Sequence, residues 1–315
     1  MISAGSLVVE LVNVALILLV GAYATVVLDI LVGRAVAGAP LRPVRALVLP
    51  FRESALFFLQ QRTTTERPDS PLGALAPAML AAIASASLLA IPFSPQPSSA
   101  GIGSGIVYFG ALMALVMVAV FLNGWSANSL FPMIGGYRFV AEALSYEMPL
   151  ALVLIGAALP AQSLSVNAIV VSQQPLWNVV RQPLGLPLYL IAGLGVAFWG
   201  PLALPDAKDL AGGTESELSG MPLFLWRFGR AAVLVAIAAM GAAVFLGGWN
   251  GPWLPGAMWM SIKTVVLLLV MVTAGHLVAR VRLERFVVAA WAVLIPLALV
   301  DVFAAGALVL LGSRQ

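Results

Sequence analysis

Six ionisable side chains stand inside long apolar stretches of the sequence, and they are the first candidates for chemistry. They are Asp29, Arg138, Glu142, Glu147, Lys263 and Asp301. A charge in hydrocarbon is costly, so residues of this kind pair with one another, bind ions or carry protons. Arg138 and Glu142 are four residues apart and would share one helix face, where they can form an ion pair.

A polar strip, RFVAEALSYEMP, runs from Arg138 to Pro149 within an otherwise apolar helix. Tyr146 and Glu147 lie about two turns beyond Arg138, and Pro149 frees a backbone carbonyl that must be satisfied nearby. The strip indicates a proton path or the wall of a wetted chamber. A satisfied network of hydrogen bonds between helices is the alternative.

The remaining ionisable groups can be explained by solvation or hydrogen bonding, without a chemical role. Asp29 and Asp301 each lie near the expected end of a helix, so we expect solvent to stabilise both. Lys263 lies near the outer end of its stretch, where it can extend to the membrane interface or pair with Asp301. His276 is the only histidine, which excludes a site with several histidine ligands, and we expect a solvated or hydrogen-bonded imidazole.

The composition places these groups in a membrane protein. Of the 315 residues, 62% are hydrophobic and 9% are charged, far from the usual balance of soluble domains. Apolar runs of about 18 residues or more, enough to cross a bilayer as helices, recur along the chain. Cysteine is absent, which excludes disulfides, iron-sulfur ligation and thiol nucleophiles, so any redox centre must belong to partner subunits.

The pattern predicts an all-α, polytopic protein with eight transmembrane helices in a single integral membrane domain, residues 1–315. The expected spans are residues 6–33, 73–93, 104–123, 138–160, 184–203, 226–247, 257–279 and 286–311. Between the first two, VRALVLPFRESALFFLQQR at about 44–62 is too polar to span and predicts an amphipathic interfacial helix. A connector helix docked on protein is the alternative.

Basic residues set the expected orientation. Most lysines and arginines fall in loops on one side of the eight spans, whereas Arg181 and Arg314 fall on the other. Positively charged loops stay on the cytoplasmic side, so both termini are expected outside, in a bacterial inner or plasma membrane. The Ser/Pro/Gly stretch IPFSPQPSSAGIGSG and the polar stretch TTTERPDSP are too short to separate domains.

One cytoplasmic loop, about residues 204–220, concentrates carboxylates. Its acidic residues are Asp206, Asp209, Glu215 and Glu217. The loop is either a solvated hairpin, the usual state of a run of charges, or a folded segment that faces a docked subunit, as its glycines suggest. The loop ARVRLERF before the last span is basic and equally well placed for docking.

A longer pattern identifies a family. The segment GWSANSLFPMIGGYRFVAEALSYEMPLAL, residues 124–152, resembles the H subunit in the membrane arm of bacterial NADH-quinone oxidoreductase, which is subunit 1 in mitochondria. QQPLW at 173–177, QPLG at 182–185, ELSG at 217–220 and FLGGW at 245–249 extend the resemblance, which runs from about residue 70 to the end.

The resemblance implies a subunit of respiratory complex I that anchors the peripheral arm, borders the quinone chamber and links it to proton pumping. Its first span, interfacial helix and sixth span would frame quinone access. By matching position, Arg138 and Glu147 would belong to the buried polar chain, and Asp209 and Glu217 to the chamber loop. From their place in the sequence we add Glu142, Tyr146 and Lys263 to the predicted polar chain, and Asp206 and Glu215 to the predicted chamber loop. Residues near the docked arm would be Arg280, Arg282 and Glu284.

The resemblance also implies what the chain itself lacks. No catalytic residue, metal or cofactor is expected in this chain, and quinone is the substrate of the whole complex. The expected partners are the other membrane-arm subunits, the soluble subunits at the quinone site and the lipid membrane, without nucleic acid.

The sequence departs from the family in its charges. Val196, Trp199 and Ala203 stand where the family carries Glu, Arg and Asp, and Glu142 stands where it usually has Gln. We therefore expect a divergent member in which quinone binding or its coupling to protons is altered, with the carboxylate chemistry passing to Glu142 and Glu147.

Two other functions remain open from the sequence. A related subunit anchors group 4 nickel-iron hydrogenases or ferredoxin-linked complexes. A transporter or anchor without catalysis would explain the missing chamber charges, although no inverted repeat typical of many transporters is evident.

Overall fold

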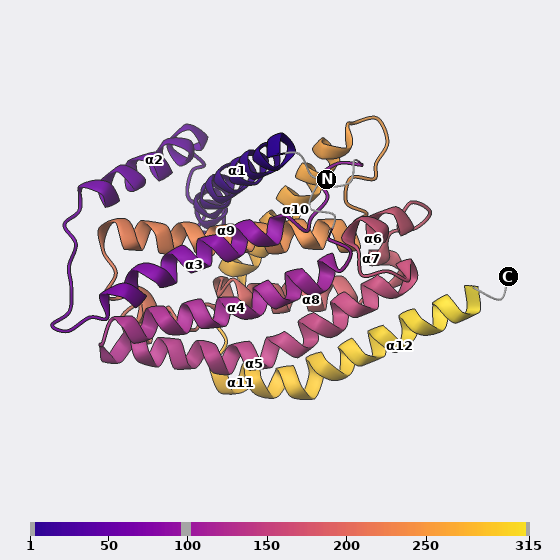
Figure 1. The fold of residues 1–315 in the computed structure, drawn as a ribbon. Helices are drawn as coiled ribbons and strands as arrows, with labels where there is room; N and C mark the ends of the chain where they lie inside the picture. The colour runs from indigo at the N-terminus through magenta and orange to yellow at the C-terminus, as the bar shows by residue number, and fades with distance from the viewer. Residues whose placement is uncertain (1–3, 96–101, 313–315) are drawn as a thin grey trace.

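Long apolar helices lie side by side through most of the chain in the computed structural model, which describes residues 4–95 and 102–312 (Figure 1). No strand occurs in these two segments, so the all-α prediction is confirmed. The middle of the Ser/Pro/Gly stretch, residues 96–101, lies outside the described residues, as does Arg314.

Seven helical segments are long and apolar enough to cross a bilayer within the described residues. They are α1 (Ala4–Val36), α3 (Ser70–Leu88), α4 (Gly105–Ser126), α5 (Leu130–Ala158), α9 (Gly220–Phe245), α10 (Gly256–Leu277), and α11 (Leu283–Ala289) continuing through a π-helical turn (Ala290–Leu294) into α12 (Ile295–Gly312). Each overlaps a span expected from the sequence.

The eighth expected span, residues 184–203, is only partly helical. Helix α8 (Gly185–Val196) has 12 residues, about 18 Å of helix, which is less than the thickness of a bilayer core of about 30 Å. Phe198 and Gly200 have positive φ angles of 38° and 59°, which a right-handed helix does not allow. The chain therefore turns after α8 and forms the 3₁₀ turn η2 (Gly200–Leu202).

Helix α2 (Pro43–Leu59) confirms the predicted amphipathic helix. It lies at the edge of the bundle, next to α1, and packs against α1 and α9 (Figure 1). Of its 17 residues only Ala46 and Pro50 are buried, while Phe51 and Phe58 are exposed. Apolar side chains exposed in this way suit the bilayer interface, which stays a prediction for α2.

Helix α9 forms the centre of the core. Its residues are buried without interruption from Ala231 to Phe245, and small side chains there let neighbouring helices approach closely. A Cβ added to Gly21 of α1 would lie 2.7 Å from Val235, and one added to Gly193 of α8 would lie 2.5 Å from Ile237. The close packing fixes the distances among α1, α8 and α9.

Short elements cover one end of the bundle. They are η1 (Leu159–Ala161), α6 (Val166–Ser172) and α7 (Asn178–Arg181). Amide side chains join them to α9: Gln173 Nε2 donates to Ala243 O at 2.9 Å, and Asn178 Nδ2 donates to Val244 O at 2.9 Å. We call this the α7 end. The acidic loop lies at the other end, because α5 begins beside that loop and ends at η1.

Lys263 stabilises a loop at the α7 end. Its side chain is 5% exposed, and Nζ donates to Gly248 O at 2.8 Å and to Asn250 O at 2.6 Å. Nζ also lies 4.4 Å from the ring centre of Trp177, a favourable cation–π distance. The sequence left open an ion pair between Lys263 and Asp301. That possibility is wrong, because two carbonyls and an indole already bind the Lys263 ammonium group.

We predict that Lys263→Met lowers the thermal stability of the protein. Each carbonyl left buried without its partner costs about 1–3 kcal/mol. Melting of the purified chain in detergent measures the loss, with Lys208→Met as control because Lys208 is exposed. Equal melting temperatures for the two variants would contradict this account of Lys263.

Candidate functional site

The acidic loop between α8 and α9 is folded. Two 3₁₀ turns, η3 (Lys208–Leu210) and η4 (Gly213–Glu215), shape it. Ala211, Gly212 and Gly213 have positive φ angles of 51°, 99° and 54°. The solvated-hairpin alternative is therefore wrong.

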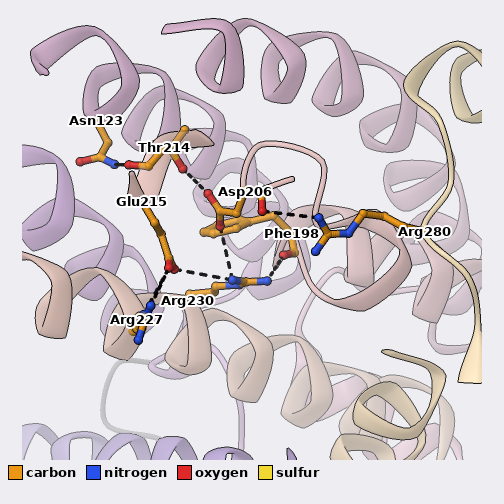
Figure 2. A network of polar contacts seen from close by, with 8 residues as sticks. All are labelled: Asn123, Phe198, Asp206, Thr214, Glu215, Arg227, Arg230 and Arg280. Atoms are coloured by element: carbon orange, nitrogen blue, oxygen red, sulfur yellow. Dashed lines mark hydrogen bonds and ion pairs between the residues drawn. The ribbon is translucent and has the colours of Figure 1, made fainter. Parts of the chain in front are cut away.

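Four charged side chains form one network beneath this loop (Figure 2). Arg230 Nη1 lies 3.3 Å from Asp206 Oδ2 and 3.7 Å from Glu215 Oε1. Arg227 Nη2 lies 3.1 Å from Glu215 Oε2. The Thr214 hydroxyl donates a hydrogen bond to Asp206. The two carboxylates thus face two guanidinium groups from the first turns of α9.

The Asp206 carboxylate is the most perturbed member of this network. Its side chain is 7% exposed, and burial raises its pKa to about 6, against the lowering effect of Arg230 and with a further raise from Glu215. A carboxyl with such a pKa changes its charge within the physiological range. The network can therefore take up or release a proton.

The network rests on aromatic rings. The Arg230 guanidinium lies 4.9 Å from the ring centres of both Phe198 and Trp199, and Nη2 donates to Phe198 O. Phe198 also packs on Phe139 of α5, with ring centroids 5.4 Å apart, and on Trp226 of α9 at 5.7 Å. These rings shield the ion pairs from solvent, which strengthens the attraction between the charges.

Other contacts attach the loop to α4 and α5. Asn123 Nδ2 donates to Thr214 O at 2.9 Å (Figure 2), and Ser129 Oγ donates to Glu217 Oε1 at 3.0 Å. Arg138 Nη1 lies 2.8 Å from Asp209 Oδ2, and this hydrogen bond lowers the pKa of Asp209.

The expected ion pair between Arg138 and Glu142 is not formed. The Arg138 side chain is 32% exposed and turns toward the loop, where Asp209 can bind it without complete loss of hydration. Glu142 is fully buried, and neither of its carboxylate oxygens has a hydrogen-bond partner among the described residues.

The polar strip on α5 is divided between two faces. Glu142 and Tyr146 share one buried face, and the Tyr146 hydroxyl also has no partner in the described part of the chain. Glu147 is half-buried and five residues from Glu142, so it points in another direction. Lys263 does not join this strip, because its ammonium group is bound at the α7 end.

The remaining candidates take different positions. Arg280 Nη1 approaches Asp206 O at 3.5 Å, whereas Arg282 and Glu284 are exposed at the start of α11. His276 Nε2 lies 2.9 Å from Asp29 Oδ1, so the expected hydrogen-bonded imidazole is confirmed. The expected solvation of Asp301 is wrong, because that side chain is 3% exposed and packs where α12 meets α5 and α8.

An apolar groove leads to the same network. It encloses about 480 Å³ between α1, α2 and α9, and Tyr23, Phe51, Phe224 and Phe228 line it. Arg227 also lines the groove, so the groove and the network share a residue that binds Glu215. Such a groove fits a flat, lipid-soluble molecule with a polar head.

Sequence reasoning missed Arg227 and Arg230 as site residues, because it counted them only as basic residues that set topology. Their spacing of three places them on one face of the helix that follows the acidic loop. That spacing, together with the loop carboxylates, is the signal that would have identified them.

Comparisons with known proteins agree on one family. The family model described as NADH dehydrogenase matches residues 10–306. The NADH-quinone oxidoreductase H subunit, copy 1, from Rhodopseudomonas palustris strain BisB5 is 37% identical over 242 residues, which cover 76% of each chain. The H subunit from Anoxybacillus flavithermus is 36% identical, over 78% of this chain and 75% of the relative. The H subunit, copy 2, from Syntrophobacter fumaroxidans is 32% identical over 84% of this chain and 83% of the relative.

We predict that Gly213→Ala opens the acidic loop. A Cβ on Gly213 would lie 1.7 Å from Pro205 O, so the backbone must separate there. Trypsin cleavage after the exposed Lys208, followed by mass spectrometry of the fragments, should become several-fold faster. Gly212→Ala is the matched control: Gly212 also has a positive φ, but nothing lies closer than 3.8 Å to its Cβ position. Equal cleavage rates in the two variants would refute the prediction.

Proposed function

Because this chain belongs to the H-subunit family of NADH-quinone oxidoreductase, we propose that it anchors the peripheral redox arm, lines the quinone chamber and links that chamber to proton translocation. The observation that carries the proposal is the continuity from the groove to the buried charges. Arg227 lines the groove and binds Glu215, which also contacts Arg230 and, through it, Asp206.

Quinone is the proposed substrate of the complex, and the chain provides its access route. The isoprenoid tail is apolar and the aromatic wall of the groove is apolar, so burial of the tail stabilises the complex. Reduction of a quinone to a quinol consumes two electrons and two protons. The electrons come from partner subunits, since this chain has no cysteine for an iron-sulfur centre.

The chain contributes to the proton side of this reaction. Asp206, whose pKa lies at about 6, changes its charge when a neighbouring quinone changes protonation. Glu142 is buried on α5, and its carboxylate oxygens have no hydrogen-bond partner among the described residues. A change in charge at the loop alters the affinity of Glu142 for a proton through a poorly screened medium. Glu142, Tyr146 and Glu147 thus form the proposed start of the proton route on α5.

The loops at the acidic end are the proposed docking face. Arg280 contacts the acidic loop, while Arg282 and Glu284 are exposed beside it and are available to soluble subunits. This end would face the cytoplasm and both termini would lie outside, following the distribution of basic residues. Residues 1–315 would then act as one membrane domain among the other membrane-arm subunits.

We predict that Ser54→Trp blocks quinone access. Ser54 lines the groove, and an indole there occupies part of its volume. In the assembled complex the KM for a long-tailed quinone should rise by about tenfold, while the KM for a short-tailed analogue should rise much less. Ala55→Trp is the control, because Ala55 is exposed and does not line the groove. Equal effects on both quinones would argue against access through this groove.

We predict that Glu142→Gln reduces proton translocation in the reconstituted complex. Gln is close in size and hydrogen-bonding groups but cannot release a proton. The ratio of protons moved to NADH oxidised should fall, and Glu66→Gln, at an exposed loop position, should leave it unchanged. An unaltered ratio in Glu142→Gln would exclude Glu142 from the proton route.

A further inference from the structure

A second candidate site lies at the α7 end of the bundle. A cavity of about 550 Å³ opens between α12 on one side and η1 and α7 on the other. Its wall combines apolar residues, among them Ala305 and Leu308, with the polar side chains of Gln162, Arg181 and Gln182. The whole of α5, 29 residues or about 43 Å of helix, separates it from the acidic loop.

A buried carboxyl lies next to this cavity. Asp301 precedes Ala305 by one helical turn, so the two share a face of α12. The Asp301 side chain is 3% exposed, and its Oδ2 has no hydrogen-bond partner among the described residues. An ionisable group at such a depth is a functional candidate by default.

Gln182 connects the cavity with Asp301. Its side chain is 1% exposed, and neither the amide oxygen nor the nitrogen has a hydrogen-bond partner in the described part of the chain. A Cβ built on Gly156 would lie 3.1 Å from Gln182 Nε2 and 3.6 Å from Asp301 Oδ2, so these atoms are at most about 7 Å apart. One or two hydrogen-bonded waters can span polar groups up to that distance apart.

The Asp301 carboxyl lies at the beginning of α8, with Oδ2 3.2 Å from the Cβ position of Gly185. It is therefore held between α12, the first residue of α8 and the side chain of Gln182, which lines the cavity.

Few other titratable groups face Asp301. Arg181 on α7 lies at the cavity wall, and Tyr189 on α8 donates its hydroxyl to Ile237 O at 2.8 Å. Neither η1 nor α5 from Leu150 to Ala158 contributes a titratable side chain. A change in the protonation of Asp301 is therefore not masked by a neighbouring acid.

We propose that Asp301 is a proton-binding site that exchanges, through Gln182 and the cavity, with the aqueous phase at the α7 end of the bundle. This goes beyond the role of the acidic loop, since it gives the chain a proton site facing the opposite compartment. The alternatives are a permanently protonated Asp301 that only supports the beginning of α8, and a cavity filled by a lipid chain that excludes water.

The infrared carbonyl band of protonated Asp301 tests the proposal without quinone turnover, so its outcome is separate from that of the proposed function. The intact complex is reconstituted in vesicles with the pH of each compartment set independently. We expect a carboxylic acid band that is lost in Asp301→Asn, which retains an oxygen acceptor near α8. The band should follow the pH at the α7 end and ignore the pH at the acidic loop.

Three variants complete the test. Asp29→Asn, a change in the exposed pair with His276, should leave the band intact. Gln182→Leu should slow the response of the band to pH several-fold. Asp301→Glu should shift the band rather than remove it, and it serves if the asparagine variant fails to assemble. Absence of the band, insensitivity to pH on both sides, or a response to the acidic-loop side would each overturn the proposal.

Discussion

The contact of Arg230 with Asp206 is the interaction on which the acidic end of the molecule depends. It joins a helix to a loop whose backbone has three successive residues with positive φ angles. Because Phe198 and Trp199 stack against the guanidinium, the ion pair is shielded from solvent. Removing either partner would leave an uncompensated buried charge, which is destabilising. The ion pair therefore stabilises this conformation of the loop, in which Glu215 binds Arg227 beside the groove.

The two ends of the bundle satisfy their polar groups in different ways. At the acidic end, carboxylates meet arginines, so protons and nearby charges can alter the balance. At the α7 end, Lys263, Gln173 and Asn178 bind backbone carbonyls, whose charge does not change with pH. Asp301 and Gln182 differ from them, because Asp301 Oδ2 and both amide atoms of Gln182 have no hydrogen-bond partner in the described residues.

The sequence predicted the helices well because span length and amphipathicity are local properties. It failed where contacts distant in sequence decide. In the span at 184–203 the helix stops at Val196 and the chain turns at Phe198, which contacts Arg230 of α9, 32 residues away. The pair of Arg138 with Glu142 is plausible on one helix, but Asp209, 71 residues away, competes for the arginine. Asp301 was expected near a helix end and solvated, yet it lies inside the span Leu283–Leu311 and packs against α5 and α8.

The departures from the family acquire a physical meaning from these contacts. Val196 and Ala203 are buried apolar residues, so neither position carries a charge that would need a partner. Trp199, where the resemblance implies an arginine in relatives, supplies a ring for Arg230. If relatives carry charges at these three positions, as the resemblance implies, fewer charges near the loop oppose or compensate a carboxylate at Glu142. We therefore propose that the protonation of Glu142 depends more directly on Asp206 in this chain, because fewer other charges lie between the acidic loop and α5.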